Sequence, residues 1–302
     1  EHMCIGVLGS GSGSAMTQSI ASSSPGYDIN ARSETAVLTG PANKVELQVT
    51  QKTAVSHDTV LLRFDLPSPA HRLGLHVGGH VMVHAPGTDG RDVVRPYTPV
   101  TLDSDLGHMD LLIKIYRAGA NPAFPQGGKM GAVIDSIRVG QSLRFSGPYG
   151  KFKYCGRGAY TLNNRPPADG APAGMMSLIA AGSGITPVYQ VIRAVLEDPH
   201  DPVLLSLVYA NRTEGDILLR KEIDALAAAH PARIKVLYVL SKPPAKWSGE
   251  SGHVSAELIA DNCFLGGPGV LGLVCGPQGF VDGAVRPGLA ALGYDDAHTV
   301  VF

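Results

Sequence analysis

Hydrophobic and polar residues alternate with a period of two between about residues 44 and 152. Short runs rich in β-branched and aromatic residues follow this pattern, and Pro, Gly or Asp turns separate them. The six runs are residues 44–50, 59–66, 77–84, 93–100, 109–116 and 142–146. One short helix is predicted over residues 128–137. Six strands without long helices predict a small antiparallel β-barrel.

The pattern changes after residue 174. Residues 175–181 form a continuous apolar run, as expected of a strand that is buried on both faces, and Pro187 then opens a helix with one apolar face. The alternation continues with strands at 203–209, 234–240, 270–275 and 299–302, and with helices at 216–229, 255–261 and 279–292. Strands that alternate with helices through short connections predict a parallel sheet. The predicted fold is thus an antiparallel β-barrel followed by an α/β domain.

The domain boundaries follow from these changes in pattern. We predict a disordered linker or tag over residues 1–40, the barrel over 41–155, a linker over 156–173 and the α/β domain over 174–302. Residues 9–14 alternate Gly and Ser, a composition that cannot bury enough apolar area to offset chain entropy. Residues 154–173 are rich in Gly, Asn and Pro and are predicted to form loops.

Composition excludes several classes of protein. The formal net charge of −1 shows no basic surplus, so we expect no nucleic-acid partner. No apolar run approaches the roughly 18 residues of a membrane span, so no membrane association is expected. The 4 cysteines are scattered without a C-x-x-C pair, which favours the cytoplasm. His80 and His84 lack a nearby carboxylate, so no metal site is predicted.

A glycine-rich turn, Gly182-Ser183-Gly184, lies where the first parallel strand ends and a helix begins. Glycines at this junction let a phosphate approach the backbone, and the helix N-terminus supplies unpaired N–H donors. Thr186 and Pro187 replace the tail of the full G-x-G-x-x-G pattern. A tight turn without a ligand remains the alternative.

Two segments of the barrel half also suit an anionic ligand. Arg95-Pro96-Tyr97-Thr98 ends a predicted strand, and the planar fork of an arginine can donate two hydrogen bonds to a phosphate. Tyr97 lies on the same face as Arg95 and can cover a ring, while Thr98 can place a hydroxyl near a ring nitrogen. Gly127-Gly128-Lys129-Met130 can form an anion nest before the short helix. An ordinary strand and a plain helix start are the alternatives.

Three further candidates lie at the carboxyl ends of the parallel strands, where ligands bind in open α/β sheets. Cys275-Gly276-Pro277 follows one strand, and its cysteine is either a contact for a reacting ring or a buried filler. Asp216 can accept from ribose hydroxyls and repel a 2′-phosphate, and it can also cap a helix. Arg212 can receive a 2′-phosphate, so the pattern favours NADH and leaves NADPH open.

Five motifs in this order resemble the ferredoxin reductase superfamily, in its cytochrome b5 reductase branch. They are RPYTPV at 95–100, IKIY at 113–116, FPQGGKM at 124–130, GSGITP at 182–187 and CGP at 275–277. Residues 185–192, 208–218 and 293–302 resemble the C-terminal flavin module of eukaryotic assimilatory nitrate reductase. The resemblance spans about residues 41 to 302. Two departures are Gly131, where the family has Ser, and Pro277-Gln278-Gly279-Phe280, where the family has a run of prolines and a methionine.

The resemblance implies FAD and NADH, or NADPH, as cofactors. The residues implied to hold FAD are Arg95, Pro96, Tyr97, Thr98, Ile113, Lys114, Ile115, Tyr116, Phe124, Gly128, Lys129, Met130 and Gly131. The residues implied to hold the dinucleotide are Gly182, Gly184, Thr186, Pro187, Arg212, Asp216, Cys275, Gly276 and Pro277. The implied catalytic residues are Thr98, near the hydride-accepting nitrogen, Lys114, between the two rings with Thr186, and Cys275, beside the reactive nicotinamide carbon.

The function that this resemblance implies is a reductase that takes a hydride from NADH and passes electrons singly to a b-type haem. The acceptor is a haem domain of the same polypeptide or a cytochrome b5-like protein. In a complete nitrate reductase, expected to be a homodimer, electrons continue to molybdenum and nitrate. The haem motif His-Pro-Gly-Gly is absent, so the chain is expected to be an excised module. The alternatives are a free-standing cytochrome b5 reductase and a non-catalytic nucleotide-binding sensor.

Overall fold

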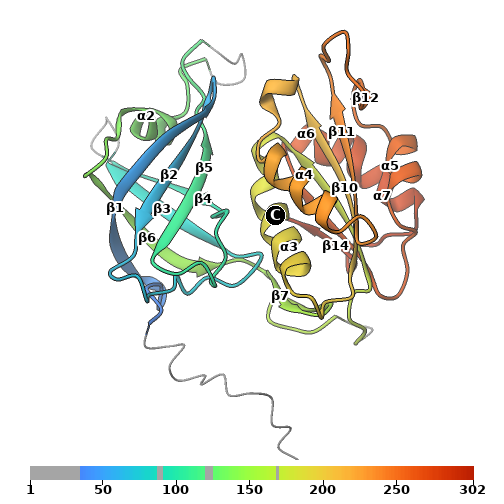
Figure 1. Cartoon of the computed structure of the whole chain (residues 1–302), viewed down its shortest axis with the longest axis horizontal. Helices are drawn as coiled ribbons and strands as arrows, with labels where there is room; N and C mark the ends of the chain where they lie inside the picture. Colours follow the sequence, from blue (N-terminus) through green and yellow to red (C-terminus); the bar gives the residue numbers. More distant parts are fainter. Residues whose placement is uncertain (1–34, 87–90, 120–124, 168–169) are drawn as a thin grey trace, which may run out of the picture. The chain divides into compact units, whose positions relative to one another are not determined.

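The computed structural model describes residues 35–86, 91–119, 125–167 and 170–302 (Figure 1). The disorder predicted for residues 1–34 and the flavin contact predicted for Phe124 lie outside the described residues. Residues 35–40 were predicted to be disordered as well, and this prediction is wrong. Val37 and Leu38 donate backbone hydrogen bonds to Arg72 and Leu73, and the Leu38 side chain is buried in the barrel core. Burial of the Leu38 side chain here offsets the loss of chain entropy, which the composition of the segment did not reveal.

The first half of the chain is a curled antiparallel sheet with the strand order β4-β3-β6-β1-β2-β5. Its strands are β1 (Gly40–Ser56), β2 (Thr59–Asp65), β3 (His80–Pro86), β4 (Asp92–Tyr97), β5 (His108–Lys114) and β6 (Ser142–Tyr149). The short helix α2 (Lys129–Ser136) lies between β5 and β6 in the sequence. Alternate residues such as Val49, Leu62, Phe64 and Phe145 form the core. The period-two prediction is confirmed.

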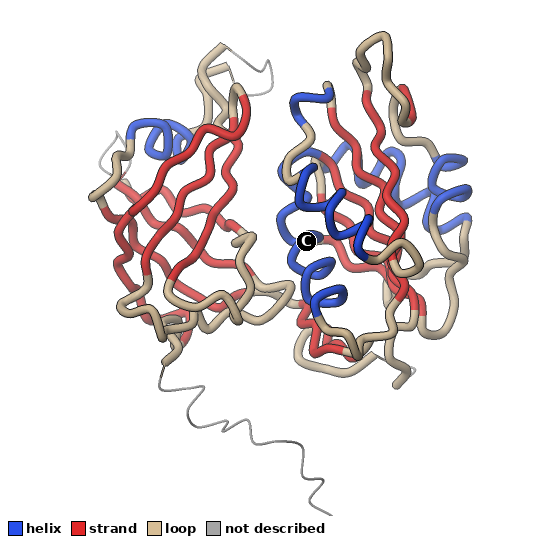
Figure 2. The backbone as a smooth tube through the Cα atoms, in the orientation of Figure 1, coloured by secondary structure: helices blue, strands red, loops and turns tan. Residues whose placement is uncertain are grey.

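The second half is a parallel sheet with the strand order β12-β11-β10-β9-β13-β14. Its strands are β9 (Met175–Ala181), β10 (Leu204–Asn211), β11 (Ile234–Leu240), β12 (Glu250–Ser251), β13 (Val270–Cys275) and β14 (Thr299–Val301). Its principal helices are α3 (Ile185–Glu197), α4 (Arg220–Ala229), α5 (Ala256–Asn262) and α7 (Arg286–Ala291). Helices lie on both sides of the sheet (Figure 2).

The two faces of this parallel sheet belong to different cores. Leu178 of β9 packs with residues of α3, whereas its neighbour Ile179 packs with residues of α5 and α7. A strand whose side chains are buried on both faces needs apolar residues at every position, which explains the unbroken run at 175–181. Because β9 and β10 pair in parallel, their carboxyl ends lie at the same edge of the sheet.

The segment predicted to be a looped linker instead contains a hairpin. Strands β7 (Phe152–Gly156) and β8 (Ala159–Leu162) pair antiparallel, and Tyr154 and Tyr160 are buried in the core that α3 shares. The Tyr154 hydroxyl donates to the carboxylate of Asp201. Both strands are short and lie in a stretch rich in glycine and proline, so the alternation of apolar and polar residues was too brief to predict strands. The division of the chain into two domains near this hairpin stays a prediction.

Two helices in the second half also differ from expectation. The helix predicted from residue 216 begins at Arg220, after a short 3-10 turn η2 (Glu214–Asp216). The helix predicted over 279–292 is divided into α6 (Gln278–Phe280), a π-helical segment η3 (Val281–Val285) and α7, with Pro287 in the first turn of α7. Proline lacks the N–H that a continuous α-helix requires. Within the described ranges, no helix is both long and apolar enough to cross a membrane.

Candidate cofactor-binding site

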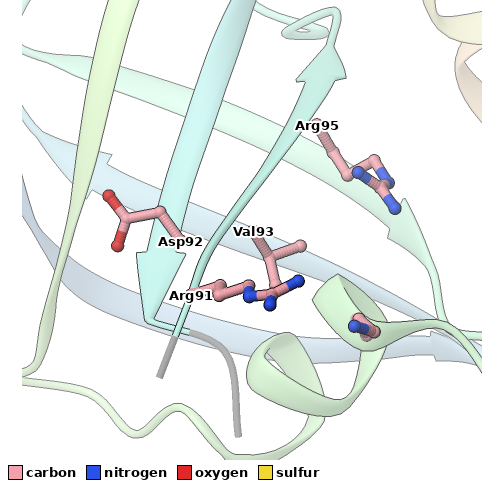
Figure 3. A pocket seen from close by; sticks show the side chains of 5 residues that line it. Arg91, Asp92, Val93 and Arg95 are labelled. Carbon is pink, nitrogen blue, oxygen red and sulfur yellow. The ribbon is translucent and has the colours of Figure 1, made fainter. Parts of the chain in front are cut away.

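A positively charged hollow of about 240 Å³ lies between β4 and the start of α2 (Figure 3). Arg91, Asp92, Val93, Arg95 and Lys129 line it. Three of these residues are cations, and the single carboxylate already has a partner, because Asp92 lies 3.3 Å from Arg144. Guanidinium groups beside a helix N-terminus suit a phosphate or pyrophosphate. The donor set therefore fits the pyrophosphate of FAD.

Arg91 contributes to this hollow although the sequence analysis did not select it. Arg91, Val93 and Arg95 occupy every second position around the start of β4, so their side chains lie on the same side and line the same hollow. The spacing of Arg91 and Arg95 was a usable signal. Arg91 was not predicted because it lies before the motif Arg95-Pro96-Tyr97-Thr98.

Tyr97 and Thr98 follow Arg95 at the end of β4 and are half-buried. The Tyr97 ring packs against the barrel core. Burial raises the pKa of Tyr97 to about 12, so the phenol is neutral at physiological pH and its hydroxyl can donate. Both residues lie where the sequence placed them, and their contacts with a flavin stay a prediction.

Not every residue predicted to hold FAD turns its side chain to the outside. Ile113, Ile115 and Met130 are buried in the barrel core. Because side chains alternate along a strand, Lys114 points to the opposite face of β5 from Ile113, and Tyr116, beyond the strand, is half-buried. Any contact of Ile113, Ile115 or Met130 with a cofactor would therefore come from the backbone.

The glycine turn before α2 packs closely on Tyr116. Gly127 has a φ of +73°, and a Cβ there would lie 2.7 Å from the Tyr116 carbonyl oxygen. The Gly128 N–H donates to the same oxygen at 2.8 Å. A Cβ at Gly131 would instead meet its nearest neighbour at 3.5 Å, so the serine of the family would fit there. The departure at Gly131 removes a hydroxyl without any steric need.

The dinucleotide turn and the Cys275 segment meet through their backbones. The turn forms the 3-10 helix η1 (Gly182–Gly184) between β9 and α3, and Gly182 has a φ of +54°. A Cβ on Gly184 would lie 2.3 Å from the carbonyl oxygen of Cys275. Only glycine permits this approach. Strand β5, which ends at Lys114, also contacts η1. Three predicted motifs are therefore gathered in one place.

Tyr209 hydrogen-bonds to this glycine turn and was not predicted from the sequence. Its ring is fully buried, and its hydroxyl donates to the Gly182 carbonyl at 2.9 Å and accepts from the Leu218 N–H at 3.3 Å. The one hydroxyl thus connects the glycine turn with the loop that carries Asp216. A tyrosine near the carboxyl end of a mostly apolar strand was the available signal.

Asp216 caps the local turn and also contacts the barrel half. Its Oδ2 accepts from the Thr213 N–H at 3.0 Å and from the Thr213 hydroxyl at 2.6 Å, so it caps the 3-10 turn η2, whereas the helix α4 begins at Arg220 without a side-chain cap. Its Oδ1 lies 3.6 Å from the ammonium of Lys114, which also pairs with Asp58 at 2.7 Å. Capping uses one carboxylate oxygen and leaves the other for Lys114 or for a ribose hydroxyl.

Asp58 is a second residue that the sequence analysis missed. Burial alone would raise the pKa of Asp58, but the hydrogen bond and the charge of Lys114 outweigh it and hold this pKa below the usual 3.8. Oxygen atoms of Asp58 and Asp216 and a ring nitrogen of His57 lie within 4.8 Å of one another, a spacing that could suit a metal ion. Here the ammonium of Lys114 already supplies the positive charge.

Cys275 ends β13 and is half-buried, and burial raises its pKa to about 11. The thiol is therefore protonated at neutral pH and is no nucleophile. The next residue, Gly276, has no room for a Cβ, which would lie 2.7 Å from the Phe280 ring. Pro277 and Arg212 are exposed, and Thr186 is buried with its hydroxyl donating to the Ser183 carbonyl at 3.3 Å.

Replacing Arg95 is expected to weaken FAD binding. The change Arg95→Gln removes a charged donor from the hollow, and a hydrogen bond to a charged group contributes about 1.5–3 kcal/mol, so the dissociation constant should rise about 10- to 100-fold. Flavin fluorescence during titration of the FAD-free protein measures this. The control Arg286→Gln removes an arginine of α7 that pairs with Asp282 and Asp296. Equal affinity in Arg95→Gln and the unchanged protein would remove the assigned role.

Comparison with known proteins supports two cofactor-binding regions. Residues 46–154 match the family described as the oxidoreductase FAD-binding domain, and residues 178–286 match the oxidoreductase NAD-binding domain. The chain is 44% identical over 259 residues to NADH-cytochrome b5 reductase 1 of Bos taurus, covering 85% of each chain. It is 46% identical over 271 residues to nitrate reductase [NAD(P)H] of Hordeum vulgare, covering 88% of this chain and 30% of that relative.

A solved structure with the same architecture is the cytochrome b5 reductase domain of Ulva prolifera nitrate reductase. It is 35% identical to this chain, with a TM-score of 0.83, and the match covers 88% of this chain and 100% of that domain. The predicted order of an antiparallel sheet before a parallel one is thereby confirmed. The chain spans less than a third of the length of the barley nitrate reductase that it matches.

Proposed function

This chain belongs to the cytochrome b5 reductase family of FAD- and NADH-dependent oxidoreductases, and from this premise we propose how its residues carry electrons. The observation on which the proposal depends is the close approach of the Gly184 and Cys275 backbones beside β5. When bound, NADH supplies a hydride, and FAD accepts it and releases electrons one at a time. The residues of the chain hold and orient these groups.

The two halves of the chain supply different parts of this site. Arg91, Arg95 and Lys129 bind the FAD pyrophosphate, and Tyr97 and Thr98 contact the flavin. The turn Gly182–Gly184 and the N-terminus of α3 bind the phosphates of the dinucleotide, and Asp216 accepts from its ribose. Holding both rings in contact makes the transfer intramolecular. No side chain has to move a proton in this scheme.

We further propose that the electron acceptor is a b-type haem, either in the same polypeptide or in a cytochrome b5-like protein. Relatives of both kinds support this: cytochrome b5 reductases and nitrate reductases. The match to the whole reductase domain of an algal nitrate reductase favours the haem domain of such an enzyme, in which molybdenum and nitrate would follow. Homodimerisation of that parent enzyme and a cytoplasmic location are parts of the same proposal. A nucleotide-binding sensor is disfavoured by membership of an enzyme family.

An absorption spectrum tests the proposal. Purified protein should carry the two visible bands of oxidised flavin, and NADH added without oxygen should bleach them. Ferricyanide should restore the bands and should be reduced continuously while NADH lasts. A folded protein that takes up no FAD, or whose bound flavin is not reduced by NADH, would refute the proposed function.

Cys275 is expected to act through its shape and position. The change Cys275→Ala should slow the reduction of bound flavin by NADH by about tenfold or more, because small displacements of reacting groups carry large penalties. Bound FAD should be unchanged. Because the thiol titrates near 11, its ionisation should leave the rate flat between about pH 6 and 9. Stopped-flow absorbance measures both effects, and an unchanged rate in the variant would contradict the role.

A further inference from the structure

The side chain of Gln190 lies on α3 but bonds to the barrel half of the chain. It is buried with 2% exposure. Its Oε1 accepts from the Gly78 N–H at 3.0 Å, and its Nε2 donates to the Pro99 carbonyl at 2.9 Å. The partners fix which end of the amide is which, since an N–H can only donate and a carbonyl can only accept. Both ends of the amide are thus occupied by backbone groups of the other half.

The two ends of this connection lie beside the two cofactor motifs. Pro99 directly follows Thr98, the residue assigned to the flavin, and Gln190 lies in the helix that begins at Ile185, directly after Gly184. Gln190 lies five positions after Ile185 in this helix, a rise of about 7.5 Å. The path from the flavin segment to the dinucleotide turn therefore consists of one hydrogen bond and a short rigid helix.

A second contact between the same elements lies further along α3 and combines an ion pair with a hydrogen bond to the backbone. Arg193 donates to the Val100 carbonyl at 3.2 Å and to the two Asp105 carboxylate oxygens at 2.7 and 3.2 Å. Arg193 therefore adds to the attachment of α3 to the barrel half without touching Pro99. This pair offers a control for attachment as such.

We propose that Gln190 is a positioning residue that sets the flavin segment Thr98–Pro99 relative to the dinucleotide turn. The proposal rests on the proposed function, because it assigns Gln190 an effect on transfer between the two rings. A buried amide with both ends bonded holds one orientation, and transfer between bound groups depends steeply on their alignment. Gln190 touches neither ring in this scheme and acts through the backbone at Pro99.

The first test is Gln190→Leu in the FAD-loaded protein. Leucine fills similar space and removes both hydrogen bonds. We expect flavin reduction at saturating NADH to slow about tenfold or more. The dissociation constant for NADH and the FAD content should stay within about twofold, because the binding residues are untouched. Stopped-flow absorbance and fluorescence titration give the two values separately.

The second test is Gln190→Glu, which keeps the size and shape of the side chain and is measured at a pH where the protein is folded. A protonated carboxyl can donate to Pro99 and accept from Gly78, whereas an ionised carboxylate has no donor. Burial raises the pKa of a carboxyl, so the protonated form should be reached at mildly acidic pH. The reduction rate, divided by that of the unchanged protein, should therefore rise as the pH falls. A residue that merely joins two surfaces would give no such pH profile.

The control is Asp105→Asn, which weakens the ion pair with Arg193 and leaves Gly78 and Pro99 bonded. It should lower the thermal unfolding midpoint and leave the reduction rate within about twofold. Equal slowing by Asp105→Asn and Gln190→Leu, a normal rate in Gln190→Leu, or a pH-independent ratio in Gln190→Glu would each overturn the inference. If the unchanged protein itself is not reduced by NADH, the proposed function fails instead.

Discussion

The change Gly184→Ala is expected to abolish most of the NADH-driven reduction of the flavin. The added Cβ would lie 2.3 Å from the Cys275 carbonyl oxygen and 2.6 Å from its carbon, and both are backbone atoms that cannot rotate away. Either the glycine turn or the end of β13 must shift. We expect a loss of about 2–4 kcal/mol in the free energy of unfolding and a reduction rate lower by on the order of 100-fold.

Chemical denaturation and stopped-flow absorbance measure these two effects. The matched control is Gly279→Ala, because Gly279 lies on α6 after the Cys275 segment and a Cβ there meets nothing within 4 Å. This control should have nearly unchanged stability and rate. A stable and fully active Gly184→Ala protein would show that the two backbones are not as close in solution as the structure has them.

The change Asp216→Ser is expected to shift coenzyme use toward NADPH. One Asp216 oxygen is available to a ribose hydroxyl, and its charge opposes a 2′-phosphate; removing the charge also leaves Lys114 with one fewer carboxylate partner. The ratio of kcat/KM for NADPH to kcat/KM for NADH should rise about tenfold or more, which corresponds to about 1.4 kcal/mol. Steady-state rates with ferricyanide as the acceptor give this ratio.

A neighbouring carboxylate serves as the control for charge alone. Glu214 lies in the same turn and pairs with Arg220 at 2.5 Å. Glu214→Gln removes one negative charge two residues away and should leave the coenzyme ratio within about twofold. If the two variants shift the ratio equally, the effect is one of net charge and Asp216 does not read the ribose.

The fold was predictable wherever the pattern of a single segment reflects its burial. Val49 and Leu47 alternate with polar residues because one face of β1 is buried, and β9 is apolar throughout because Leu178 and Ile179 enter different cores. The β7–β8 hairpin escaped prediction because Tyr154 and Tyr160 stand in short strands within a glycine-rich stretch. Their burial depends on α3, which the local sequence does not show.

The site was predictable where a motif is contiguous and less so where it depends on distant partners. The Gly182–Gly184 turn and Cys275 were found, but not that their backbones touch. Asp58 was missed because its partner is Lys114, and Gln190 was missed because its partner Gly78 lies 112 residues away. A single sequence contains both residues of such a pair, but it does not show that the two residues contact each other.

The protonated thiol of Cys275 has a consequence for the durability of the protein. Peroxide and electrophiles attack the thiolate far faster than the thiol, and little thiolate forms at neutral pH when the pKa is near 11. We therefore expect the sulfur at the end of β13 to react slowly with peroxide at neutral pH. The burial that places this residue beside Gly184 should also lower its sensitivity to oxidation.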